Sequence, residues 1–220
     1  METVDDIRAT ITAQLTTDDA DIRSQYLTHF SQQVSDFSEA MSRAFIEWRR
    51  LDGPLNGSEK KGYVSALVYC AIALHISSMK LFLSGHTIPA GNLHRQVAET
   101  IALACLCSAN DLDVLDRFIQ DKYSTNDAIR DALRQVGRFR LNEDAIDVLK
   151  RAQEFYHKFS HPSQLMIAHH MSFSDGSILL GASFDNGKIE QYGKEVAGKV
   201  SLAKVFGNFV TGIRANLSNW

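Results

Sequence analysis

The sequence predicts an all-α protein, a mostly antiparallel bundle of helices with a small β-hairpin-like insert before the last helix. Two observations lead to this prediction. Apolar residues recur every three or four positions through most of the chain, which is the period of amphipathic helices. Segments richer in β-type residues, separated by Gly-containing turns, fall between positions 171 and 192.

Composition and charge are those of a soluble globular protein. The 220 residues are 45% hydrophobic and 22% charged, with only 3 prolines, so little of the chain suits linkers. The formal charge of -3 argues against a surface made entirely for nucleic acid. We therefore expect a single helical domain over 1–220, with residues 1–16 as a short helix or N-terminal arm and residues 171–192 as the insert.

The first half of the chain predicts two long helices. Apolar residues keep helical spacing over 22–48, and the turn-forming segment LDGPLNG at 51–57 ends that helix. Ser58 can cap the next helix, which stops at Ser84 and Gly85.

That second helix is apolar, but polar residues interrupt it before it reaches the roughly 18 residues of a membrane span. We expect it to be buried, with no membrane partner. The chain opens on the polar stretch METVDDIRATITAQ, and its cysteines lie in apolar helical segments, which favours a cytoplasmic protein. The three cysteines are Cys70, Cys105 and Cys107.

The segment Pro89 to Asn110 is predicted to be the central helix. It is apolar on nearly every side from Val97 to Cys107, so it should be surrounded by other helices. Yet it carries Arg95 and Glu99 one turn apart.

The second half of the chain predicts shorter helices and the insert. Helices are expected over 111–123, 124–137 and 142–161, the last ending before Pro162. After the insert, apolar residues return with helical spacing over 193–217.

Arg95 and Glu99 form the first candidate site. Arginine before glutamate is the weaker order for a pair within one helix, so stabilising an isolated helix is a poor explanation. A buried ion pair costs desolvation energy and needs further partners. The pair is therefore either a structural bridge or part of a functional site.

The second candidate site is the segment RAQEFYHKFSHPS at 151–163. A histidine can transfer a proton near neutral pH, and an arginine can hold a phosphate through two hydrogen bonds. Arg151, His157 and His161 could thus split a phosphodiester in RNA without a metal ion. For His161, the simpler interpretation is an interaction with the helix C-terminus.

The spacing of Arg151 and His157 resembles the R-x4-6-H motif of the HEPN superfamily. These helical proteins include metal-independent ribonucleases of toxin, defence and RNA-processing systems. The resemblance implies that Arg151 and His157 are the catalytic pair, and that a homodimer forms the active cleft.

A second resemblance spans about Val64 to Ser163. GNLHRQVAET followed by FYHKFSHPS is similar to a family of bacterial helical proteins of unassigned function, which pair an R-x3-E helix with a Ser-His-Pro-Ser-like helix end. This resemblance implies that Arg95, Glu99, Ser160 and His161 face one another.

Two other patterns favour ordinary interpretations. Three arginines four residues apart could follow a phosphate backbone, but a solvated helix face is the favoured interpretation; they are Arg130, Arg134 and Arg138. Four histidines could contribute to a zinc site, but no cysteine or other clear third ligand lies near them in the sequence, so we expect no metal and no cofactor. They are His157, His161, His169 and His170.

The expected function is that of a HEPN-like protein of a bacterial stress or defence system, acting as a metal-independent ribonuclease on RNA. The alternative is a non-catalytic helical module that binds a protein or small ligand, with its Arg, Glu and His residues as a structural cluster.

Overall fold

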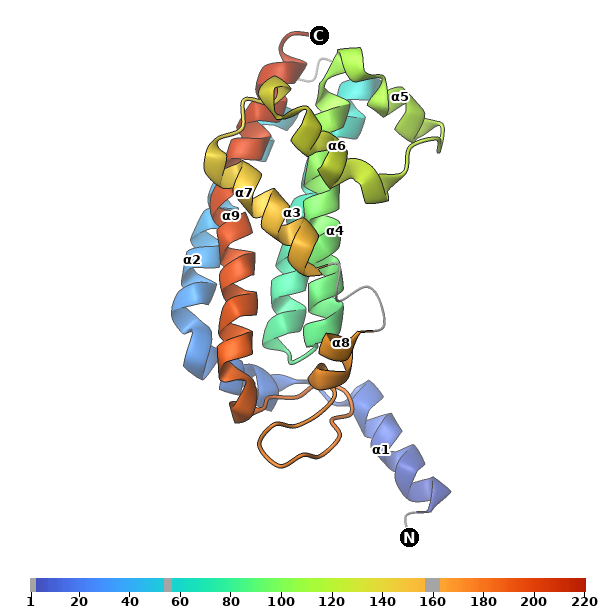
Figure 1. The fold of residues 1–220 in the computed structure, drawn as a ribbon, viewed down its shortest axis with the longest axis vertical. Coiled ribbons are helices and arrows are strands. Elements are labelled where there is room, and N and C mark those ends of the chain that lie inside the picture. The colour runs from blue at the N-terminus through green and yellow to red at the C-terminus, as the bar shows by residue number, and fades with distance from the viewer. Residues whose placement is uncertain (1–2, 54–56, 157–162) are drawn as a thin grey trace.

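The computed structural model describes residues 3–53, 57–156 and 163–220, and within them the chain is all-α. Four long helices run along the body of the molecule (Figure 1): α2 (Ala20–Asp52), α3 (Glu59–Leu83), α4 (Thr87–Ser108) and α9 (Ile189–Leu217). The shorter helices are α1 (Val4–Thr16), α5 (Val114–Ile119), α6 (Ala128–Arg134), α7 (Glu143–Tyr156) and α8 (Gln164–His169). The predicted helical bundle is confirmed.

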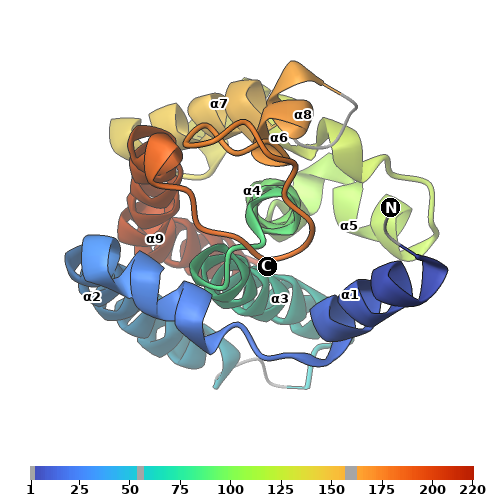
Figure 2. The ribbon, with the colours of Figure 1, turned by 90° about the horizontal axis from the view of Figure 1, so that it is seen from below.

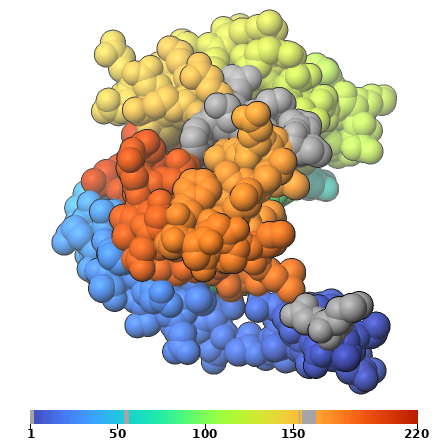
Figure 3. All heavy atoms as spheres, turned by 60° about the horizontal axis from the view of Figure 1, so that its bottom comes forward, coloured from blue at the N-terminus to red at the C-terminus, as the bar shows by residue number. Residues whose placement is uncertain are grey.

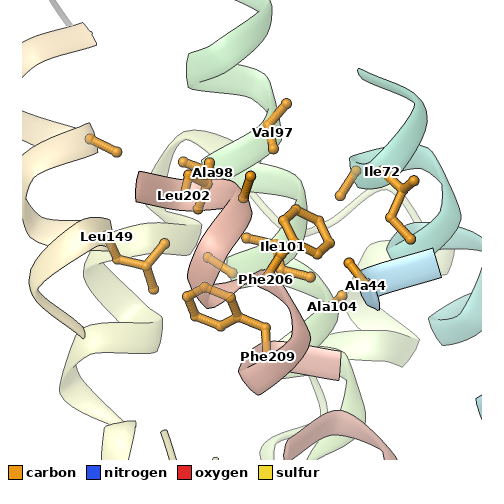
Figure 4. Close-up of a cluster of buried hydrophobic side chains, with 14 of the residues drawn as sticks. Ala44, Ile72, Val97, Ala98, Ile101, Ala104, Leu149, Leu202, Phe206 and Phe209 are labelled. Carbon is orange, nitrogen blue, oxygen red and sulfur yellow. The ribbon is translucent and has the colours of Figure 1, made fainter. Parts of the chain in front are cut away.

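Helix α4 lies at the centre of the bundle, as its sequence predicts. It contacts α3, α6, α7 and α9, and Figure 2 shows it encircled by other helices. Its apolar side chains meet the aromatic rings of α9, and Figure 4 shows Ile101 and Ala104 of α4 in one buried cluster with Phe206 and Phe209 of α9. All four side chains are buried, so α4 and α9 together hold much of the hydrophobic core.

The turn between α3 and α4 depends on a glycine. Gly85 has φ +81°, a conformation that other residues rarely adopt. A Cβ atom there would also lie 2.7 Å from backbone atoms of Ser183 and from the side chain of Ile22. The turn therefore brings the start of α2 and the insert against the end of the bundle.

Helix α1 projects from the body of the molecule. It begins at a capping box in which Thr3 and Asp6 satisfy each other's backbone N–H groups, but it buries no residue. Figure 3 shows its dark blue spheres standing away from most of the chain. The expected short N-terminal helix is therefore present, and it contributes nothing to the core.

The insert contains no strand among its described residues, and the expected hairpin is limited to one isolated antiparallel bridge between Met171 and Ile178. A side chain organises this segment. The Asp185 carboxylate accepts hydrogen bonds from the Phe173 backbone N–H, at 2.5 Å, and from the Ser174 hydroxyl. Hydrogen bonds to this carboxylate, and not backbone pairing between two strands, therefore hold the segment together.

Several predicted boundaries shift. The helix expected over 111–123 is reduced to α5, because Asp113 and Asp121 adopt positive φ at its two ends, which aspartate tolerates better than most residues. Helix α9 begins four residues earlier than predicted, at Ile189. The end of the helix expected over 142–161 lies outside the described residues.

By length and composition alone, helix α3 is apolar enough to cross a membrane, but core helices of soluble proteins pass the same test. Only 44% of its most apolar 18-residue segment is buried inside the protein. The expectation that this helix is buried therefore holds for one side only.

Candidate functional site

Arg95 and Glu99 form an ion pair on the central helix. The Nε of Arg95 donates to Oε1 of Glu99 over 2.7 Å, and the two side chains are 21% and 15% exposed. The sequence predicted this juxtaposition from the spacing of one helical turn. The pair is largely shielded yet still reaches solvent.

The pair lines a surface cavity of about 360 Å³. Helix α4 supplies one wall, and the 3-10 turn Thr125–Asp127 supplies the other. Every lining side chain that the structure describes is polar or charged: Asn92, Arg95, Gln96, Glu99 and Asn126. We call this the α4 cavity, and it presents a guanidinium, a carboxylate and three amides.

One lining residue has unused hydrogen-bonding capacity. The Oδ1 atom of Asn92 is shielded from solvent and receives no hydrogen bond from the residues that the structure describes. An unsatisfied shielded acceptor costs about 1 to 3 kcal/mol. A small rotation of this amide toward the cavity would let a bound donor remove that cost.

The structure places the remaining predicted site residues only in part. Arg151 lies on α7, is exposed, and does not line the α4 cavity. The other three, His157, Ser160 and His161, lie outside the described residues. The helices on either side of that segment, α7 and α8, both contact α4.

The described residues contain no group of three or more His, Cys, Asp and Glu side chains that could hold a metal ion. Of the histidines weighed for zinc, His169 is buried, and its Nδ1 lies 2.8 Å from the Thr87 hydroxyl. His170 is exposed. These two rings therefore do not share a site.

The three arginines spaced four residues apart are largely paired with acidic residues. Arg130 binds Asp127 over 3.0 Å, and Arg138 forms a short ion pair with Asp111. Arg134 lies 3.7 Å from Asp131. This arrangement matches a solvated helix face, as expected from the sequence.

A second set of polar groups, which sequence analysis did not predict, lies inside the bundle. Lys199 of α9 is 1% exposed. Its Nζ donates to the Ser78 hydroxyl over 2.8 Å and to the Ala90 carbonyl over 3.2 Å. A buried ammonium is thereby held between α3, α4 and α9.

Glu195 lies one turn before Lys199 and is equally buried. Its Oε1 accepts a hydrogen bond from Gln191 Nε2 over 3.1 Å, and His169 Nε2 lies 3.4 Å from the same oxygen. Lys188 donates to the His169 carbonyl over 3.0 Å. We call Thr87, His169, Lys188, Glu195 and Lys199 the buried polar cluster.

Burial shifts the pKa values of this cluster. It raises the pKa of Glu195 and lowers that of Lys199, because each loses hydration in its charged form. Burial, together with the positive charge of Lys188, lowers the pKa of His169 to about 4. The cluster joins α8 and the start of α9 to the central helices, and its burial favours a structural role.

The fold and the α4 cavity define a helical-bundle protein with a polar surface site on its central helix. No family model, curated protein or solved structure matches the chain.

Proposed function

We propose that this chain is a HEPN-like protein of a bacterial stress or defence system that binds RNA and cleaves it without a metal ion. The observation that supports RNA binding is the α4 cavity, in which the Arg95 and Glu99 pair is surrounded by amides. Protein sites for small molecules occupy about 300 to 1,000 Å³, so this cavity suits a group the size of one nucleotide.

The lining residues have the chemistry that single-stranded RNA requires. Amide and guanidinium N–H groups donate to phosphate oxygens and base edges. The Glu99 carboxylate and the amide oxygens accept hydrogen bonds from base amines or a 2′-hydroxyl. The cavity could thereby distinguish RNA from DNA at one nucleotide.

Cleavage is assigned from the resemblance to HEPN ribonucleases. In this assignment His157 relays the proton of the 2′-hydroxyl, Arg151 stabilises the charge that develops on the phosphate, and His161 with Ser160 supports them. Arg151 is exposed on α7 and has no ion-pair partner among the described residues. The guanidinium of Arg151 is thus available to a phosphate. The protein proposed here acts as a homodimer in the cytoplasm.

The test is an RNA cleavage assay in the presence of a chelator. Purified chain is incubated with labelled single-stranded RNA, beside Arg151→Ala, His157→Ala and His161→Ala. Loss of a general acid or base should slow cleavage about 100-fold or more. Lys150→Ala, which removes an exposed neighbouring cation paired with Asp147, should leave the rate unchanged. Absence of cleavage, or its survival in all three variants, would end the enzyme proposal.

A non-catalytic binding module is the second candidate. It is favoured by the closed geometry of the Arg95 and Glu99 pair, in which the two charges satisfy each other. Gln96→Ala and Asn126→Ala change exposed residues of the cavity. If they weaken ligand binding while the purified chain cleaves no RNA, the module is the better description.

A further inference from the structure

Helix α3 exposes an apolar face along most of its length. Its large side chains Tyr63, Tyr69 and Ile76 are 41%, 46% and 49% exposed. The exposed residues between 62 and 79, which we call the α3 outer face, are Tyr63, Ala66, Tyr69, Cys70, Ala73, Ile76 and Ser77. At 3.6 residues per turn they fall within a sector of roughly 140°.

Charges are absent from this face and occur only at its ends. The segment 62–79 of α3 contains no Lys, Arg, Asp or Glu. Of the charged residues at its ends, Glu59 and Lys80 fall in the sector of this face, whereas Lys60 and Lys61 lie outside it, and Lys60 pairs with Asp116. A helix that is apolar on every side is normally surrounded by protein. In α3, the neighbouring helices α2, α4 and α9 cover one side, and the other side faces solvent.

The aromatic part of the face is held in place by a contact with helix α2. The ring of Tyr69 packs against Trp48 of α2, with centroids 4.9 Å apart. Trp48 is itself fixed, because its Nε1 donates to the Ser65 carbonyl over 3.1 Å. The face therefore presents a preorganised surface, which lowers the entropy cost of binding.

The face is self-complementary. Reading outward in both directions from the point between Tyr69 and Cys70, the helix meets Ala66 and Ala73 at the same distance, and then Tyr63 and Ile76. One turn further out, it meets Glu59 and Lys80. Two antiparallel copies of α3 centred on this point would thus place small residues against small, large apolar residues against large, and each carboxylate against an ammonium.

The terminal charges support this pairing. Glu59 and Lys80 are both exposed, and neither has an ion-pair partner among the residues that the structure describes. In an antiparallel dimer each would meet the opposite charge of the second copy, twice per interface. Parallel packing would instead bring like charges together.

We propose that the α3 outer face is the interface of a two-fold homodimer, in which the α3 helices of two copies pack antiparallel. The alanines and Cys70 permit close approach of the two backbones, and the tyrosines and Ile76 close over the sides of the contact. The interface shares no residue with the α4 cavity or with α7, so a dimer through α3 would not build the active cleft that the HEPN resemblance implies, and it is tested independently of RNA cleavage.

The single exposed cysteine provides a direct test. Cys70 lies beside the proposed two-fold axis, whereas Cys105 and Cys107 are each 1% exposed. Mild oxidation of the purified full chain with copper phenanthroline and oxygen should join two copies through Cys70. Cys70→Ser should remain uncrosslinked under the same conditions and keep the dimeric mass in solution.

Variants of the face test the geometry. Ala66→Glu and Ala73→Glu change exposed positions, so each should keep the wild-type far-UV circular dichroism spectrum and yield a monomer of 24.5 kDa by light scattering. Glu59→Lys should weaken dimerisation roughly tenfold, because it replaces two attractive pairs with repulsive ones. Adding Lys80→Glu to it should restore the wild-type affinity.

Three outcomes would overturn the proposal: a wild-type chain that stays monomeric at micromolar concentrations, a dimer that survives both glutamate variants, or a charge swap that fails to restore affinity. If the monomer instead binds phosphatidylcholine and phosphatidylglycerol vesicles, and Ala73→Glu abolishes that binding, the face belongs to a lipid surface. If the glutamate variants fail to fold, Glu59→Lys alone and combined with Lys80→Glu still tests the interface, because these changes leave the apolar residues of the face intact.

Discussion

His169 of α8 and Glu195 of α9 meet inside the bundle, with Nε2 of the histidine 3.4 Å from Oε1 of the carboxylate. The other ring nitrogen of His169 lies 2.8 Å from the Thr87 hydroxyl of α4. One ring therefore lies between the central helix α4 and two later helices, α8 and α9. Such buried titratable groups make the stability of the fold sensitive to pH.

Stability should fall as the pH falls from about 6.5 toward 4. Burial lowers the pKa of His169 to about 4 and of His75 to about 3, and His94 is shifted in the same direction. In this window the unfolded chain binds more protons than the folded chain, so acid favours unfolding. The pKa of Glu195 is raised by burial, which acts in the opposite direction, but one carboxyl does not offset three histidines.

Urea unfolding across this pH range measures the effect. His75→Phe keeps a ring between Phe37 and Phe206. It should remove about 2 to 3 kcal/mol of the stability change between pH 7 and 4.5. A wild-type unfolding free energy that is flat in this range, or an unchanged slope in the variant, would contradict the burial of neutral histidines.

Lys199→Ala should destabilise the protein by about 3 to 5 kcal/mol, since it removes a buried ammonium that donates to Ser78 and Ala90 and whose charge favours the ionised form of Glu195. Lys204→Ala is the matched control, because Lys204 lies on the same helix but is 58% exposed and pairs with Asp36 at the surface. It should cost less than about 1 kcal/mol. In a double-mutant cycle, Glu195→Gln should recover part of the loss in Lys199→Ala. Equal melting temperatures for the two lysine variants would argue against the buried ammonium.

Glu99→Ala should lower the free energy of unfolding by about 1 to 3 kcal/mol, because it leaves the Arg95 guanidinium without its carboxylate in a largely shielded place. Glu39→Ala breaks a pair of the same spacing, with Arg43, whose side chains are 66% and 75% exposed. That control should change stability by less than about 0.5 kcal/mol. If the two variants melt alike, the α4 cavity is an open site and the pair has no structural role.

Two glycines of α9 should respond to alanine in opposite ways. A Cβ at Gly212 would lie 2.3 Å from the carbonyl oxygen of Phe139, whereas a Cβ at Gly207 would meet nothing within 4 Å. Gly207→Ala should therefore stabilise the helix by about 0.5 to 1 kcal/mol. Gly212→Ala should destabilise the protein by more than about 1 kcal/mol, because backbone must move. Thermal melts of the two variants decide this, and a stabilised Gly212→Ala would refute the close contact with Phe139.

The sequence was sufficient for the bundle and for the Arg95 and Glu99 pair, because both follow from helical periodicity. It could not reveal the buried polar cluster. Glu190 and Lys194 have the same spacing and order as Glu195 and Lys199, yet the first two are exposed and the second two are buried. Only packing against α3, α4 and α8 distinguishes the two pairs, and local spacing does not encode that packing.

The insert and α3 show two further limits of pattern reading. The turn residues around Asp185 predicted a hairpin, but its carboxylate binds the Phe173 N–H and competes with strand pairing. The apolar residues of α3 predicted a buried helix, but one of its sides is exposed in the single chain. Periodicity cannot indicate whether a helix packs against its own chain or against a second copy. Both outcomes depend on contacts between distant segments.

Helix α1 also has a practical consequence. Since it buries no residue and its 13 residues extend about 20 Å at 1.5 Å per residue, it can serve as a rigid spacer. A biotin acceptor or fluorescent protein fused ahead of it would be carried away from both the α4 cavity and the α3 outer face. Immobilisation through this end should therefore leave both surfaces accessible on a biosensor.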